Sequence, residues 1–283
     1  MQRYVTACVE EQHYCEPITE LAAWASHKLK APLRLVHVMD DDDIFAEPDL
    51  SHYMGLGAHE ELVQSWTDSA LARSHNQIIQ SQQLLDELQI KLKSQGLTNI
   101  SQQYFHGHLI DTLKEHDLEI RTLVLGKSGH TNDAMPHHIG HHIEPLLRTL
   151  DIHTLIASNE FIAPHSFMLA FDGSPHAEDM LDKVIASPIL TNLTCHLVMV
   201  HGHHNEYEAF ERATHRLVNA GFNVFTAHLD GDLPHALTDY QLLNDIHLLV
   251  MGAYSHSKIH NMMFGSHTTR ILNDTDISVM ILK

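Results

Sequence analysis

Cationic side chains are scarce in this sequence of 283 residues: 17 lysines and arginines stand against 36 aspartates and glutamates, for a formal net charge of −19. Nucleic acids and anionic membrane surfaces are bound through clustered cations, so the charge argues against both as partners. No run of about 18 uncharged apolar residues occurs, and the N-terminal MQRYVTACVEEQHY lacks the apolar region of a signal peptide. The sequence therefore predicts a soluble cytoplasmic protein with no membrane partner.

Cysteine and the common hydrolase motifs are also rare or missing. The three cysteines, Cys8, Cys15 and Cys195, are not spaced as metal ligands, and their odd number suits a reducing compartment. No G-x-x-x-x-G-K-[ST] motif is present, which argues against a P-loop NTPase. Neither Ser174 nor Ser266 lies in a G-x-S-x-G nucleophile elbow. We therefore expect no catalytic residues and do not expect an enzyme, although a slow ATPase is left open.

Histidine, by contrast, is abundant. The 28 histidines outnumber all lysines and arginines together. Near pH 6.5 about half of the imidazoles would carry a proton, which would cancel much of the negative charge. Metal binding, pH sensing and a simple compositional bias all agree with this count, and composition alone does not choose among them.

The chain contains an internal repeat of about half its length. Short apolar runs at Tyr4–Val9 and Phe167–Phe171 each lead into a helix-like segment. Further apolar runs then correspond in order: 33–39 with 195–201, 121–129 with 247–255, and 153–158 with 278–283. Apolar strands that alternate with helices predict parallel sheets covered on both faces. We therefore predict two α/β domains, residues 1–160 and 166–283, each a doubly wound sheet of about five parallel strands.

The first copy is about 36 residues longer than the second. The extra residues fall between its second strand and its late helix, and we assign them to an insertion within 40–95. Residues 67–95 of this insertion read as a polar helix with leucines at helical spacing. Its role as a lid, an oligomerisation arm or part of a ligand pocket is not indicated by the sequence.

The second copy has polar and glycine residues where its strands end. Asp172, Gly173 and Ser174 follow its first strand, Gly252 ends its fourth, and Gly265 and Ser266 come after a loop. In an open parallel sheet, ligands bind beyond the carboxyl ends of strands where the strand order reverses. A carboxylate there can accept hydrogen bonds from ribose, and glycines let the backbone approach a phosphate closely. Taken alone, a glycine after a parallel strand is more often part of a plain turn, and Asp-Gly-Ser is also a good helix N-cap.

In combination, these residues resemble a known family. The segment GAYSHSKIHNMMFGS (252–266) is similar to the G-x-x-G-(nine residues)-G-[S/T] nucleotide loop of the universal stress proteins, and FDGSPHAEDML is similar to the other half of their ATP pocket. The resemblance covers essentially the whole chain, as a tandem of two such domains. It implies an adenine nucleotide alpha hydrolase-like fold with strand order 3-2-1-4-5, whose last strands pair across the two domains.

The resemblance also implies roles for individual residues. Asp172 matches the ribose-binding acid, and Val200 matches a residue that lines the adenine. The resemblance thus implies a stress-response regulatory protein that binds ATP or AMP in its second domain without robust turnover. It further implies a homodimer of tandem chains and a protein partner that the sequence does not identify. The residues expected to form this nucleotide site are Asp172, Gly173, Ser174, Val200, Gly252, Ser255, Gly265, Ser266 and His267.

Both copies depart from the family pattern. Ser255 stands where the loop has its second glycine, at a cost of about 1 kcal/mol if that position needs a positive φ. In the first copy, Glu10-Glu11-Gln12 replaces Asp-Gly-Ser, ten residues instead of nine precede Gly140, and His141 replaces the Ser or Thr. We expect no nucleotide in the first domain. A nucleotide-free interaction or scaffold module, in which both sites have decayed, is the alternative.

A second alternative is a metal- or pH-responsive protein. If a helix begins within MPHHIGHH (135–142), His137/His141 and His138/His142 form i, i+4 pairs, each able to share a zinc ion. The interpretation that the composition favours is a solvated loop, because close histidine pairs arise by chance in a chain with 28 histidines.

Overall fold

The computed structural model describes residues 2–9, 15–39, 58–127, 142–200, 204–252 and 271–283, and it forms one sheet of ten strands with helices on both faces. The strands are β1 (Tyr4–Cys8), β2 (Leu33–Met39), β3 (Ile100–His106), β4 (Ile120–Gly126), β5 (Thr154–Ala157), β6 (Ser166–Ala170), β7 (Thr194–Val200), β8 (Val224–Leu229), β9 (Leu248–Gly252) and β10 (Ser278–Leu282). The helices are α1 (Cys15–Leu29), α2 (Ala58–Ser94), α3 (Leu109–Glu115), α4 (Ile143–Thr149), α5 (Pro175–Ala186), α6 (His204–Asn219) and α7 (Leu233–Leu243), with a 3-10 turn at Asp117–Glu119.

The sheet consists of two halves with the same strand order. The sequence of neighbours is β3-β2-β1-β4-β5-β10-β9-β6-β7-β8, so that β1–β5 follow the order 3-2-1-4-5 and β6–β10 repeat it from the opposite edge. All pairs within each half are parallel, whereas β5 and β10 pair antiparallel. The predicted doubly wound α/β fold and the predicted pairing of the two last strands are both confirmed.

The central strands are continuous apolar runs because they are covered on both faces. β5 and β10 are buried at every position, and β2 and β7 are buried at nearly every position. The outermost strands are different: β3 (ISQQYFH) and β8 (VFTAHL) are half-buried or exposed throughout. Polar residues on these two strands suit the edges of a sheet, where one side of the backbone is unpaired.

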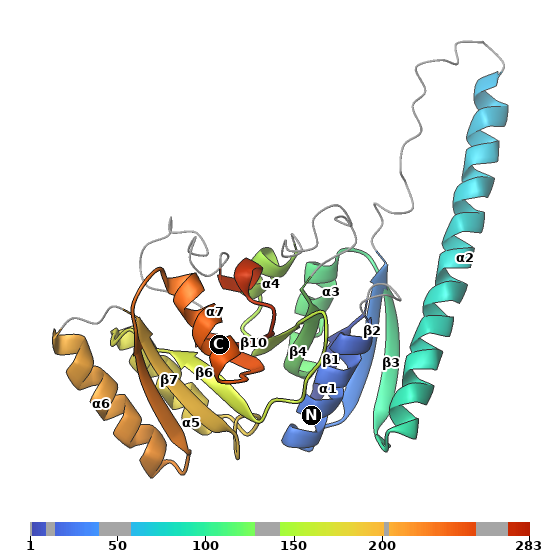
Figure 1. The fold of residues 1–283 in the computed structure, drawn as a ribbon. Helices are drawn as coiled ribbons and strands as arrows, with labels where there is room; N and C mark the ends of the chain where they lie inside the picture. The colour runs from blue at the N-terminus through green and yellow to red at the C-terminus, as the bar shows by residue number, and fades with distance from the viewer. Residues whose placement is uncertain (1, 10–14, 40–57, 128–141, 201–203, 253–270) are drawn as a thin grey trace.

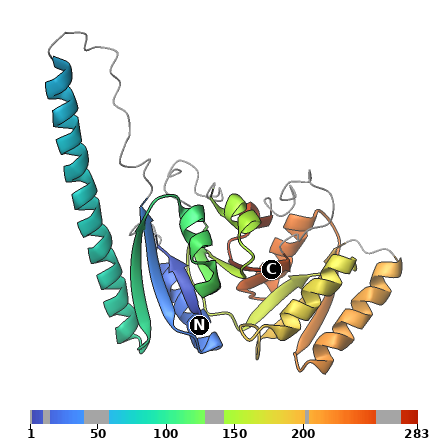
Figure 2. The same cartoon turned by 180° about the vertical axis from the view of Figure 1, so that it is seen from behind.

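Each face of the sheet has its own layer of helices. In the first half, α1 and α2 pack against one face, whereas α3 and α4 pack against the other (Figures 1 and 2). In the second half, α5 and α6 share one apolar cluster with α1. α7 and the helical residues 271–274 pack on the opposite face with a separate cluster. No helix among the described residues is both long and apolar enough to cross a membrane.

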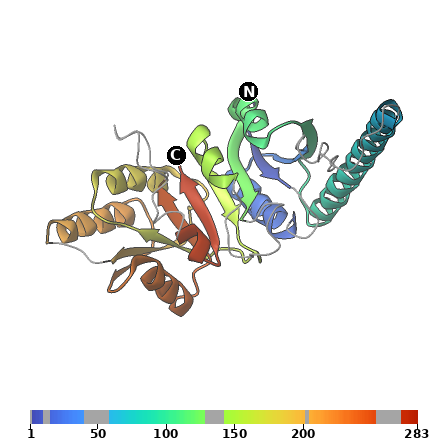
Figure 3. The same cartoon turned by 90° about the horizontal axis from the view of Figure 1, so that it is seen from above.

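Helix α2 holds much of the extra length of the first half. It has 37 residues, whereas its counterpart α6 has 16. Its C-terminal part contributes Leu84, Leu85, Leu88 and Leu92 to the core, and its N-terminal part extends well beyond the sheet (Figures 1 and 3). The helix expected at 67–95 therefore begins earlier, at Ala58. Residues 40–57 lie outside the described residues.

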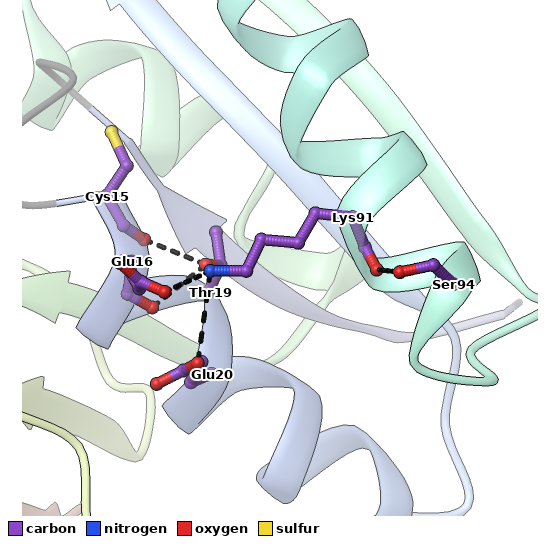
Figure 4. A network of polar contacts seen from close by, with 6 residues as sticks. All are labelled: Cys15, Glu16, Thr19, Glu20, Lys91 and Ser94. Atoms are coloured by element: carbon purple, nitrogen blue, oxygen red, sulfur yellow. Dashed lines mark hydrogen bonds and ion pairs between the residues drawn. The ribbon is translucent and has the colours of Figure 1, made fainter.

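The base of α2 is tied to α1 by charge. Lys91 forms ion pairs with Glu16 and Glu20, whereas Thr19 donates its hydroxyl to the carbonyl oxygens of Cys15 (2.8 Å) and Glu16 (Figure 4). The ion-paired side chains are partly exposed, and exposed ion pairs stabilise a protein by about 0–1 kcal/mol. The buried leucines therefore hold α2 in place, and the ion pairs fix its direction.

The two halves meet along a seam, the antiparallel pair of β5 with β10. Beyond its backbone ladder, the Oγ atoms of Ser158 and Ser278 lie 3.2 Å apart across the seam. At one end, Lys28 of α1 donates to the carbonyl oxygen of Thr191 at 2.9 Å. The core cluster of α1 and α5 runs through the seam without a break, so the halves form one packed body.

Candidate functional site

The predicted site begins at the turn between β6 and α5. Asp172 is exposed, and its Oδ1 accepts a hydrogen bond from the backbone N–H of Ser174 at 3.0 Å. Ser174 is the N-cap of α5, because its Oγ accepts from the backbone N–H of Ala177 at 3.2 Å and Pro175 opens the helix. The Ser174 hydroxyl is thus engaged in capping. Within the described part of the chain, we find no hydrogen bond to the second carboxylate oxygen of Asp172.

Gly173 lets this turn form. Its φ is +72°, a region that side-chain-bearing residues rarely adopt. A Cβ at this position would stand 3.2 Å from the Cα of Glu206, at the start of α6. The absence of a side chain therefore permits both the left-handed backbone and the close approach of α6.

Three strand ends converge beside this turn. β6 is flanked by β7 on one side and β9 on the other, all three parallel. Val200 ends β7 and is half-buried, and Gly252 ends β9. The chain moves from β6 to β7 on one side and returns to β9 on the other, which is the point of strand reversal where ligands bind in such sheets. The fold thus places Asp172, Val200 and Gly252 at one edge.

Gly252 also lies close to helix α5. A Cβ on Gly252 would lie 3.2 Å from Sδ of Met180, which belongs to α5. A side chain at position 252 would require the flexible Met180 side chain to shift by a few tenths of an ångström. The remaining residues expected at the site, Ser255, Gly265, Ser266 and His267, lie outside the described residues.

A lysine from the first half of the sheet binds the helical residues 271–274 near the end of the chain. Lys127, directly after β4, is 8% exposed and donates through Nζ to the carbonyl oxygen of Asn273 at 3.1 Å and to that of Thr275. Burial lowers the pKa of Lys127, and the charges of Asp276 and Asp274 oppose that shift. Sequence reasoning missed this contact, because its acceptors are backbone carbonyls about half a chain away.

In the first half of the sheet, the structure describes only part of the region that corresponds to the candidate site. Gly126 ends β4 as expected, whereas 10–14 and 128–141, with Glu10, Gly129 and Gly140, lie outside the described residues. His137, His138 and His141 lie outside them as well. His142 is described and is the N-cap residue of α4, which begins at Ile143. Among the described residues, no group of three or more His, Cys, Asp or Glu is placed to hold a metal ion.

The fold defines a class: a doubly wound α/β protein in which two halves of the same strand order form one sheet. Residues 201–283 match the model of the Universal stress protein family. The chain is 26% identical over 284 residues to Universal stress protein Slr1230 of Synechocystis sp., an alignment that covers 99% of both chains. The chain is thus similar to a universal stress protein along its whole length, and its last part matches the family model.

Solved structures agree on the fold. A universal stress protein from Archaeoglobus fulgidus is 11% identical and superposes with a TM-score of 0.65, covering 99% of this chain and 96% of that one. A putative universal stress protein from Pseudomonas aeruginosa is 14% identical with a TM-score of 0.64, covering 100% and 93%. At these identities the likeness bears on architecture alone, and it extends over both halves.

Proposed function

We propose that the chain is a stress-response regulatory protein that binds ATP or AMP at the strand-reversal edge of its second half, without robust turnover. The observation that carries the proposal is the exposed Asp172 carboxylate at the meeting point of β6, β7 and β9, with one oxygen held by the Ser174 N–H. The engaged oxygen fixes the orientation of the carboxylate. The other oxygen faces no competing donor among the described residues, and it can accept from the hydroxyls of a ribose.

The neighbouring residues supply the rest of a nucleotide pocket. Val200 offers an apolar surface for the adenine ring. The loop after Gly252, with Gly265 and Ser266, supplies backbone N–H groups for phosphates, as its resemblance to the family loop implies. Lys127 supports this arrangement at the other end, since it holds the last residues of the helix that follows the loop. No general base aimed at a terminal phosphate is evident in the sequence, so we propose binding without hydrolysis.

We also propose that residues 1–160 and 166–283 are the two domains. β5 ends at Ala157 and β6 begins at Ser166, and the strand order repeats on either side of that connection. The division assigns the nucleotide to the second domain, because its strand-reversal edge carries the Asp-Gly-Ser turn. The first domain would then act as the partner that stabilises it along the seam.

Removal of the Asp172 charge tests the site. In equilibrium titrations with labelled ATP and AMP, Asp172→Asn should weaken binding at least tenfold, because a hydrogen bond to a charged group contributes about 1.5–3 kcal/mol. The matched control is Asp239→Asn on α7, which removes the same charge from an exposed position in the same half and should leave affinity unchanged. Equal binding by Asp172→Asn and the parent would show that the assigned pocket is wrong.

A second variant distinguishes a nucleotide site of reduced affinity from one that no longer binds nucleotide. Ser255→Gly restores the glycine of the family loop and should raise ATP affinity about fivefold, equivalent to about 1 kcal/mol. If neither the parent nor Ser255→Gly binds ATP or AMP at millimolar concentration, the nucleotide-free interaction module becomes the better explanation.

A further inference from the structure

The backbone ladder of the seam is short. β5 has four residues, and the registered pairs are Val279 with Ile156, Met280 with Leu155, and Ile281 with Thr154. The next contact along the seam is made by a side chain. The backbone N–H of Lys283 donates to Nδ1 of His153 at 3.0 Å. An imidazole nitrogen thus takes the acceptor role at the end of this seam that carbonyl oxygens take along the ladder.

This contact fixes the protonation of the ring. A backbone N–H can only donate, so Nδ1 must carry a lone pair, and His153 must be neutral with its proton on Nε2. In the imidazolium form both ring nitrogens carry hydrogen and neither accepts. Protonation would therefore replace a hydrogen bond with two hydrogens pointing at each other.

The surroundings of His153 also disfavour a positive charge. The ring is half-buried, and the charged groups around it are Lys183 from α5, Lys283 directly after β10 and Asp151 from the turn before β5. Burial lowers the pKa of His153 below its usual 6.5, Lys183 lowers it further, and Asp151 opposes them. The Lys283 ammonium donates to the carbonyl oxygen of Leu147, the end of α4. Lys283 therefore contacts the first half of the sheet twice, through its backbone N–H at His153 before β5 and through its ammonium at Leu147 of α4.

We propose that His153 is a proton-sensitive latch of the seam: its neutral ring accepts from Lys283 and closes the end of the β5–β10 pair, and its protonation releases that end. The proposal is independent of nucleotide binding. It gives a specific role to one of the 28 histidines, and it concerns the contact between the two halves of the sheet.

The direction of the pH dependence follows from the lowered pKa. Above the ordinary value of 6.5, the ring is neutral in both the folded and the unfolded chain, and its contribution is complete. As the pH falls below that value, the unfolded chain takes up a proton more readily than the folded one. The stabilisation is therefore lost progressively on acidification, until the pH has passed below the lowered pKa of the folded state.

Amide hydrogen exchange at the seam tests the latch in the full chain. In the parent, protection of the segment 278–283 should fall roughly 2–10-fold between pH 7.5 and pH 5.5 after correction for intrinsic exchange, which corresponds to loss of one hydrogen bond. His153→Asn places an amide oxygen near the position of Nδ1 and does not titrate. It should keep its protection at both pH values.

Two further variants complete the test. His153→Leu has no acceptor and should show weak protection of 278–283 at both pH values. His165→Asn removes an exposed histidine from the connection between the halves and should behave as the parent does. The latch is refuted if the parent loses no protection at pH 5.5, or if His153→Asn loses as much as the parent.

Discussion

Truncation of Leu155 to alanine is expected to lower the free energy of unfolding by about 2–5 kcal/mol, the usual cost of a cavity at a fully buried leucine. Leu155 lies in the middle of β5, has no exposed surface, and pairs with Val124 of β4 on one side and Met280 of β10 on the other. Its side chain belongs to the cluster that includes α1 and α5. The cavity would therefore open within the seam, where neither half can collapse to fill it independently.

Calorimetry and urea unfolding would measure this loss. The matched control is Leu243→Ala, the same truncation at the end of α7, where the side chain is 84% exposed. That variant should stay within about 0.5 kcal/mol of the parent. If the seam couples the halves, the parent should unfold in one transition and Leu155→Ala at a lower temperature. A loss no larger than that of Leu243→Ala would contradict the packing described for β5.

The second large effect is expected at Gly173. Gly173→Ala should cost about 2–4 kcal/mol, because a left-handed backbone costs about 1–2 kcal/mol and a forced contact about 1–3. The clash is with backbone, the Cα of Glu206, which a rotamer change cannot relieve. Because the turn also orients Asp172, the substitution should weaken nucleotide binding under the proposed function.

Gly221→Ala is the control for Gly173→Ala. Gly221 has φ +91°, and a Cβ there would meet nothing within 4 Å. Gly221→Ala should lower the free energy of unfolding by about 1–2 kcal/mol, through backbone strain alone. The difference between the two variants in urea unfolding isolates the approach of α6. If Gly221→Ala is as costly as Gly173→Ala, then strain alone explains both and the contact with α6 is unimportant.

The sequence predicts the inner part of the fold well and its edges poorly. The apolar runs at 33–39 and 278–283 coincide with β2 and β10 to within a residue, because central strands covered on both faces are apolar throughout. β3 and β8 were not located from the sequence. In β3, ISQQYFH has neither an apolar run nor a regular alternation, since an edge strand beside helix α2 is only partly covered.

Some residues of the candidate site could also be recognised from the sequence, whereas the contacts between the two halves could not. Asp172 and Gly252 were recognisable because turns at strand ends use few residue types, and the fold places both at one edge. Lys127 and His153 were not singled out. Each contacts backbone atoms more than a hundred residues away, and a lysine or histidine next to a strand carries no local sign of such a partner. Contacts across the seam depend on how the halves dock, which no short segment encodes.

The antiparallel union of β5 and β10 has a consequence for how the molecule responds to dilution. Two separate subunits joined by such a pair would come apart as concentration falls. Here both strands are on one polypeptide, so their encounter is intramolecular, with an effective concentration on the order of millimolar for flexibly tethered partners. The pairing of β5 with β10 therefore does not depend on the protein concentration. A proton at His153 or a cavity at Leu155 can loosen it, but the tether keeps the two halves within reach for rebinding.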